Sequence, residues 1–131
     1  DTFRAAARFV LNREFLQELE KLSKGQFPDE LERVLEDVHF WRIDLDTSAA
    51  REMLAKNIHE LVQKLAANPA DHSITQEINQ YLDMASNLEI EVDLSQAQIC
   101  LLRIARTLMA DVDVDAPESF RLLADRMSVI I

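Results

Sequence analysis

Glycine, proline and cysteine are scarce in this sequence. The 131 residues include one glycine, three prolines and one cysteine. Glycine and proline interrupt helices, so a chain with few of them favours long helices joined by short connections. A single glycine also excludes a phosphate-binding glycine loop. The lone thiol, Cys100, cannot form an internal disulfide, and its apolar surroundings in the sequence suit a reducing cytoplasm.

Basic residues are also few, with 14 Lys and Arg against 24 Asp and Glu, which gives a net charge of -10. This charge repels phosphate backbones and anionic bilayers, so we expect neither a nucleic acid nor a membrane as partner. No apolar run reaches the roughly 18 to 20 residues that a membrane-spanning helix needs. The sequence begins at Asp1 without an initiator Met. We expect a piece of a longer chain, with residues 1–131 forming a single helical domain.

Apolar residues recur at helical spacing in six stretches, so we expect an all-α fold. In the first stretch one predicted buried stripe contains Phe3, Ala7, Val10, Leu11, Phe15, Leu19 and Leu22. The predicted helices cover about residues 2–24, 28–43, 47–67, 71–88, 94–110 and 117–127. Short connections between them indicate an up-and-down bundle of five to six helices. The helix at 94–110 should be central and most buried, because apolar residues surround most of it.

Particular residues are predicted to begin and end these helices. Gly25 can adopt the left-handed conformation that ends the first helix. Pro28 should occupy the first turn of the second helix, where the missing amide hydrogen is tolerated. Asp46 or Thr47 is expected to cap the third helix, and Asp93 the fifth, since a short oxygen-bearing side chain accepts from first-turn amides.

Two short motifs resemble parts of metal sites. Asp111, Asp113 and Asp115 have the first spacings of a calcium-binding loop. Ala116 then replaces the glycine that the loop requires, and Leu122 replaces the bidentate glutamate. A solvated acidic loop is therefore the favoured interpretation.

His59 and Glu60 begin a zinc-protease helix motif, but Gln63 stands where the second histidine should be. His39 and His72 have no ligand spacing to it. Neither Cys100 nor Ser95 has the sequence context of a nucleophile. We expect no catalytic residue, no metal site and no cofactor in these 131 residues.

Phe40, Trp41 and Arg42 form a candidate contact surface beside His39. Tryptophan and arginine are enriched where proteins contact one another, and an aromatic ring can also stack on a sugar. Core packing or a contact between domains is favoured over ligand stacking, because adjacent apolar residues on a helix cover both its buried face and its flank.

Two segments carry a resemblance to a known family. The first is Ala6-Ala7-Arg8-Phe9-Val10-Leu11-Asn12 with Phe15; the second runs from Asn68-Pro69-Ala70-Asp71 to Leu88–Gln98. The second resembles the end of the helical region that follows the catalytic domain in bacterial alpha-amylase-like proteins of glycoside hydrolase family 57. In that region an acidic and hydrophobic lead-in precedes a helix that opens Leu-x-x-Ala-Gln, here Leu94, Ala97 and Gln98. Ser95 and Ile99-Cys100 depart from its usual residues.

The resemblance implies a noncatalytic C-terminal accessory domain of an enzyme acting on alpha-glucans, packed against the upstream catalytic domain of the same chain. The catalytic carboxylates would then precede Asp1, and Gln98 would be a buried polar anchor holding a loop. Two other hypotheses remain open from the residues themselves. One is a free-standing interaction module, including a homodimer, and the other is a small helical enzyme or metal-binding protein.

Overall fold

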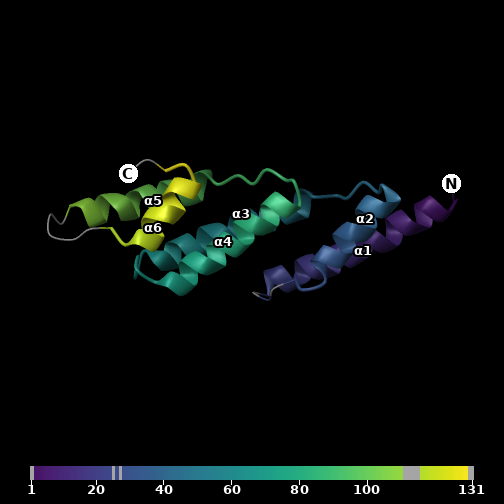
Figure 1. The fold of residues 1–131 in the computed structure, drawn as a ribbon, viewed down its shortest axis with the longest axis horizontal. Coiled ribbons are helices and arrows are strands. Elements are labelled where there is room, and N and C mark those ends of the chain that lie inside the picture. The colour runs from purple at the N-terminus through teal and green to yellow at the C-terminus, as the bar shows by residue number, and fades with distance from the viewer. Residues whose placement is uncertain (1, 25, 27, 111–115, 130–131) are drawn as a thin grey trace. The chain divides into compact units, whose positions relative to one another are not determined.

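A computed structural model of the chain describes residues 2–24, 26, 28–110 and 116–129 (Figure 1). In this part of the chain six α-helices and no strand are present, so the predicted all-α fold is confirmed. The helices are α1 (Thr2–Ser23), α2 (Leu31–Trp41), α3 (Ser48–Leu65), α4 (His72–Asn87), α5 (Ser95–Met109) and α6 (Glu118–Arg126). Each corresponds to one of the six periodic stretches of the sequence.

The start of α2 differs from the prediction. Pro28 does not lie in the first helical turn, because α2 begins at Leu31. The amide of Leu31 donates to the carbonyl of Pro28 at 3.2 Å, which closes a separate turn before the helix. Asp29 within that turn bonds Lys21 of α1 through its carboxylate. Asp29, which the sequence places in the first turn of the helix, thus precedes α2 and contacts α1 instead. The predicted stop at Gly25 lies outside the described residues.

Aspartate side chains organise the starts of three helices. Asp71 accepts from the amides of Ser73 and Ile74 at 3.0 and 3.3 Å. Asp46 and Asp93 each accept from a backbone amide and a hydroxyl two residues ahead, Ser48 and Ser95 respectively. The N-cap position of α5 is Leu94, which makes no side-chain capping bond, so Asp93 lies one residue before the predicted position. The serine hydroxyls, and then the amides, hold the pKa of both carboxyls below its usual value. These contacts satisfy amide groups that have no acceptor within the helix.

Three helices end at residues other than glycine in the left-handed conformation. Arg42, Glu89 and Ser128 have φ values of 52°, 55° and 60° and follow α2, α4 and α6. The next amide in each case bonds back into the helix, as Ile43 does to the carbonyl of Val38 at 3.0 Å. This geometry costs about 1 kcal/mol for a residue with a Cβ. It shows how a chain with a single glycine stops its helices.

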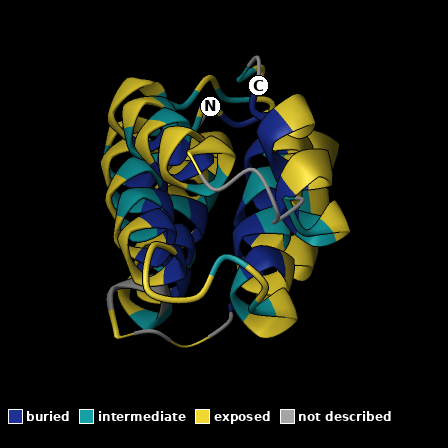
Figure 2. Ribbon diagram, turned by 90° about the vertical axis from the view of Figure 1, so that its left-hand side faces the viewer, coloured by how far each residue is buried: buried dark blue, intermediate teal, exposed yellow. Residues whose placement is uncertain are grey.

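The chain divides into two compact units, residues 1–53 and 54–131, and the boundary lies within α3. In the first unit α1 and α2 form an antiparallel hairpin: Phe3 near the start of α1 contacts Trp41 at the end of α2, and Lys21 pairs with Asp29 before α2. Buried apolar residues are dark blue in Figure 2; in this unit they are Leu11, Phe15, Leu19, Leu31, Val34, Val38, Ile43 and Ala50. The expectation of one domain over 1–131 stays a prediction.

In the second unit α4 and α6 pack together, and Arg126 connects them. Its guanidinium donates to Asn79 Oδ1 at 2.8 Å and to Asp83 Oδ1 at 2.6 Å. The buried apolar residues of this unit are Leu54, Ile58, Leu61, Val62, Leu65, Ile78, Tyr81, Met84, Ala85, Ala97, Leu101, Ile104, Ala105, Phe120, Leu123, Ala124 and Met127. They recur along one face of each helix, as packing between helices requires.

The helix α5 is less enclosed than the sequence suggests. Its buried residues are Ala97, Leu101, Ile104 and Ala105, whereas Ile99 and Met109 are 53% and 62% exposed. The buried residues follow an i, i+4, i+7, i+8 spacing, which defines one face of a helix. Neighbouring helices therefore cover that face, while the apolar residues that widen the stripe stay outside it.

Tyr81 should titrate above its usual pKa near 10, because its phenol is buried in α4 and ionisation is disfavoured by desolvation and then by Glu77. The raised pKa means that folding is favoured fully below pH 10 and less as the pH rises through the pKa of the folded state. Tyr81 is the only tyrosine, so tyrosinate absorbance at 295 nm reports it alone. We expect an upward-shifted midpoint that returns to about 10 in urea.

The control is Tyr81→Phe, which should remove the absorbance change and flatten the alkaline loss of stability. An unshifted midpoint in the folded protein would contradict the buried position of this ring.

Candidate protein-interaction surface

The predicted contact surface at Phe40, Trp41 and Arg42 lies at the C-terminal end of α2, where Phe40 is 76% exposed and Trp41 39% exposed. The two rings meet edge to face, with centroids 5.0 Å apart. Phe3 of α1 contacts Trp41 from the other helix at 4.8 Å and is itself 60% exposed. Three aromatic rings therefore form one exposed cluster, although large apolar side chains are normally covered.

Phe3 and Val10 are where the sequence prediction for α1 is wrong. The helical spacing predicts both in the buried stripe, but Phe3 and Val10 are 60% and 49% exposed, while Leu11 and Phe15 are buried. At 100° per residue, Leu11 and Phe15 point in nearly the same direction, whereas Val10 and Phe3 lie on the flank. The apolar residues of this helix span an arc too wide for one neighbouring helix to cover, and this width is the feature of the sequence that indicates exposed apolar residues on the flank.

A groove of about 320 Å³ opens beside the aromatic cluster, and we call it the aromatic groove. It is lined by Phe3, Ala6, Ala7, Val10, Leu11, Glu14, Asp37 and Trp41. Its walls come from both helices of the hairpin. The alanine side chains leave the space that larger residues would fill, so the groove is open to a side chain from outside.

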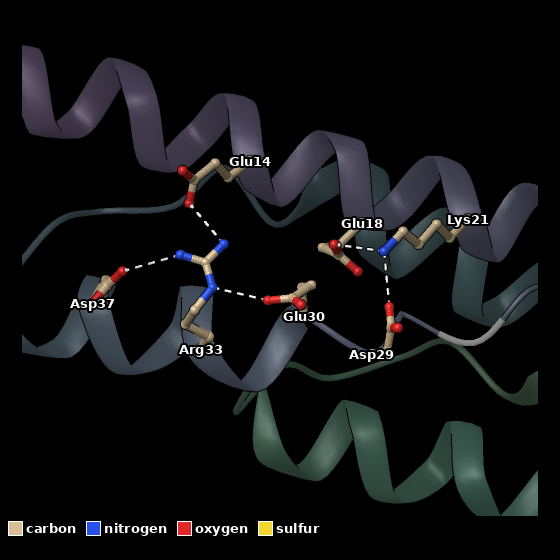
Figure 3. A network of polar contacts seen from close by, with 7 residues as sticks. All are labelled: Glu14, Glu18, Lys21, Asp29, Glu30, Arg33 and Asp37. Carbon is tan, nitrogen blue, oxygen red and sulfur yellow. Dashed lines mark hydrogen bonds and ion pairs between the residues drawn. The ribbon is translucent and has the colours of Figure 1, made fainter.

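The far end of the aromatic groove is acidic. Glu14 and Asp37 share Arg33 of α2, whose Nη2 and Nη1 lie 3.8 and 3.9 Å from their carboxylate oxygens (Figure 3). Arg33 bonds more closely to Glu30, at 2.9 Å, and that bond is the main reason why the pKa of Arg33 is raised. One guanidinium thus lies within 4 Å of three carboxylates. Glu14 Oε2 is buried and has no hydrogen bond. Negative charge remains at this end.

Lys21 forms two ion pairs near the connection between α1 and α2, away from the aromatic cluster. Its Nζ lies 2.9 Å from Glu18 Oε1 and 2.8 Å from Asp29 Oδ1 (Figure 3). The hydrogen bond to Asp29 raises the pKa of Lys21 and lowers that of Asp29. Glu18 is buried, and its second oxygen has no hydrogen-bond partner. A buried carboxylate needs such a cation, so Lys21 helps to fix the pairing of α1 with α2.

The aromatic end of the groove is basic. Residues 2–10 contain Arg4 and Arg8 and no acidic residue, in a chain of net charge -10, whereas Arg13 is adjacent to Glu14 at the other end. Arg4 donates through Nη2 to the carbonyl of Arg42 at 2.7 Å, which places its charge beside the end of α2. Arg42 itself is exposed. Aromatic rings together with arginine are the composition typical of residues that dominate binding energy at protein interfaces.

Gln98 lies in the first turns of α5 and is half-buried. Its Nε2 donates to the carbonyl of Met127, 29 residues later, at 2.8 Å. Met127 follows the last residue of α6, so the amide joins the start of α5 to the segment after α6. The side chain is thus less buried than predicted, and its role as a polar anchor stays a prediction that this hydrogen bond supports.

Replacing Gln98 by alanine should lower the free energy of unfolding by about 1 kcal/mol, since the Met127 carbonyl then loses its donor. Urea denaturation followed by circular dichroism measures this. Gln96→Ala is the matched control, because Gln96 is exposed two residues away in the same helix. Equal small effects of both substitutions would show that Gln98 does not act as an anchor.

The other candidate residues do not converge. Among the described residues no three of His, Cys, Asp or Glu are grouped so that they could hold a metal ion. His59 Nε2 lies 3.2 Å from Gln63 Nε2, so these two residues contact each other along α3. Cys100 is a half-buried free thiol. The acidic run at 111–115 lies outside the described residues.

No protein-family model matches this chain, and none of the curated proteins or solved structures searched is similar to it. The resemblance to glycoside hydrolase family 57 proteins thus stays a prediction from the residues quoted for it. Within the described residues, every helix is too short or too polar to pass through a bilayer.

Proposed function

We propose that this chain is a noncatalytic helical docking domain that binds another protein through the aromatic groove. The observation that carries the proposal is the exposed contact of Phe3, Trp41 and Phe40 across two helices. Exposed aromatic rings are unfavourable in water and are typical of surfaces that a partner covers. The hairpin that presents them is held by ion pairs away from the cluster, so the rings are presented on a fixed framework.

In its more specific form, we propose that the domain is the C-terminal accessory part of a cytoplasmic alpha-amylase-like enzyme of glycoside hydrolase family 57 acting on alpha-glucans. Its partner would be the catalytic domain upstream in the same chain, which it packs against or stabilises. The support is the sequence resemblance around Leu94, Ala97 and Gln98. The specific form therefore rests on different residues from the docking surface itself.

Calorimetric titration of this chain into the separately produced upstream catalytic domain tests both forms. Saturable binding that weakens at least about tenfold, or 1.4 kcal/mol, with Trp41→Ser and not with Leu122→Ser supports docking through the groove. Leu122 is a suitable control because it is 64% exposed on α6. Restored glucan-processing activity would support the enzyme family. Two well-folded partners that do not bind would contradict the specific form.

A free-standing homodimer is the second candidate, and the exposed apolar side chains of α1 and α2 are its support. The three rings, 60%, 76% and 39% exposed, offer about 350 Å² if each side chain has roughly 200 Å² of surface. A stable dimer buries about 800 Å² per partner. Phe9 and Leu16 of α1, 69% and 51% exposed, would have to join the interface. Light scattering across a dilution series measures whether the chain dimerises.

A further inference from the structure

We infer that the occupant of the aromatic groove is one amphipathic α-helix of about three turns, with an acidic end and a basic end. This deepens the proposed docking function and rests on it. The acidic end would meet Arg4 and Arg42, the basic end would meet Glu14 and Asp37, and apolar side chains between them would cover Trp41, Phe3 and Val10.

The length of the occupant follows from the lining of the groove. Phe3 and Glu14 mark its two ends on α1 and are eleven residues apart. At 1.5 Å per residue this is about 16 Å, or three helical turns. Ala6 and Ala7 line the intervening stretch, and their small side chains allow a helix to approach α1 closely. An antiparallel pair with an apolar groove along its seam accepts a third helix as in a small bundle.

The charges of the occupant follow from the two ends of the groove. The Arg4 guanidinium is 2.7 Å from the Arg42 carbonyl, at the end where Trp41 and Phe3 meet. At the other end, the carboxylates of Glu14 and Asp37 lie 3.8 and 3.9 Å from the Arg33 guanidinium. This guanidinium also bonds a third carboxylate more closely, so negative charge is in excess there. Opposite charges at the two ends attract both ends of a helix of complementary charge order, whereas a helix of uniform charge would be attracted at one end and repelled at the other.

The same observations disfavour other occupants. A two-fold dimer with parallel helices would bring arginines at the aromatic ends face to face, whereas an antiparallel dimer would match acidic and basic ends, so the charges disfavour the parallel arrangement alone. The rings alone also provide less than half of the area that a stable dimer buries. An anionic bilayer would meet the Glu14 and Asp37 carboxylates within the groove, and like charges repel. Weak or transient contacts bury less area than a stable dimer, so a short helix with both charges suits this surface.

The test uses two synthetic 14-residue peptides of identical composition, both without Trp or Tyr. Each has leucine at helical spacing; one has glutamates at one end and lysines at the other, and its isomer has both residues mixed at each end. Trp41 is the only tryptophan in the chain, so a blue shift of its emission reports occupancy of the groove. We expect the peptide with separated charges to bind at least tenfold more tightly than its isomer.

The matched variants are Val10→Glu and Leu16→Glu. The two residues are 49% and 51% exposed on the same helix, but only Val10 lines the groove. Circular dichroism confirms that both variants fold. Val10→Glu should weaken binding of the peptide with separated charges at least tenfold, and Leu16→Glu should leave it within twofold. Equal losses for both variants would place the peptide outside the groove and overturn the inference.

Other outcomes separate this inference from the proposed docking function. Equal affinity for the two peptides, or no emission shift with either, overturns the charged helix as occupant. The proposed docking function then stands if Val10→Glu still weakens binding to the upstream catalytic domain. It fails if Val10→Glu changes neither peptide binding nor binding to that domain.

A dimer that Val10→Glu dissociates identifies a second copy as the occupant. An emission shift with phosphatidylglycerol vesicles and with neither peptide identifies a lipid surface. Both results overturn the inference.

Discussion

Replacing Phe15 by alanine is expected to lower the free energy of unfolding by about 3 to 5 kcal/mol. The ring is fully buried on the face of α1 that packs in the first unit, between Leu11 and Leu19 along the helix. Truncation removes favourable burial of the ring and leaves a cavity that neighbouring side chains fill only partly. Chemical denaturation followed by circular dichroism measures the change, and an unchanged m-value would show that it reflects stability.

The control for Phe15 is the next residue in the sequence. Leu16 is 51% exposed, and Leu16→Ala should change stability by no more than about 0.5 kcal/mol, as for other surface substitutions. The contrast matters because both residues are large and apolar, and the composition of α1 alone does not distinguish them. Similar effects of the two substitutions would contradict the assignment of the buried face.

Phe120→Ala should also cost about 3 to 5 kcal/mol, and its effect should concentrate in α6. This helix has nine residues, and isolated helices below about 12 residues are marginal in water. It therefore depends on its packed face, where Phe120 and Ala124 are fully buried and Leu123 is 1% exposed. Hydrogen exchange should show loss of protection of the α6 amides together with the loss of global stability.

Leu122→Ala is the corresponding control, because Leu122 is 64% exposed on the same helix. Its α6 amides should keep the protection of the unsubstituted protein. If Phe120→Ala left α6 protected while stability fell, packing of Phe120 would not be what holds this helix.

The positions of the helices could be predicted from sequence because they depend on local chemistry. Apolar residues recur at helical spacing in each, and Asp46 and Asp93 bond amides two residues ahead. These interactions span a few residues, so the pattern contains them. The start of α2 could not be predicted in the same way. Asp29 there bonds Lys21 of another helix, and a contact between helices is not encoded in local periodicity.

In the candidate site, too, features set by neighbouring residues could be predicted and contacts between helices could not. Phe40 and Trp41 are adjacent, so the sequence alone indicated a local aromatic surface. Phe3 is 38 residues from Trp41 and joins it only when α1 and α2 pair. The aromatic groove likewise needs alanines from α1 and Asp37 from α2. Gln98 was a plausible polar anchor, but its acceptor at Met127 depends on how α6 packs.

The hairpin of α1 and α2 also affects when the aromatic groove forms. Both helices lie within residues 2–41 and are joined by a short connection, so little chain entropy is lost when they pair. Lys21 and Asp29 are eight residues apart and can pair early, whereas Phe3 and Trp41 are 38 residues apart, a span close to the 43 and 47 residues of the Arg126 contacts with α4. All four hairpin residues nevertheless precede α6 in the chain. During synthesis the hairpin can therefore fold long before α6 leaves the ribosome. A partner encoded earlier in the same chain would already be present to bind it.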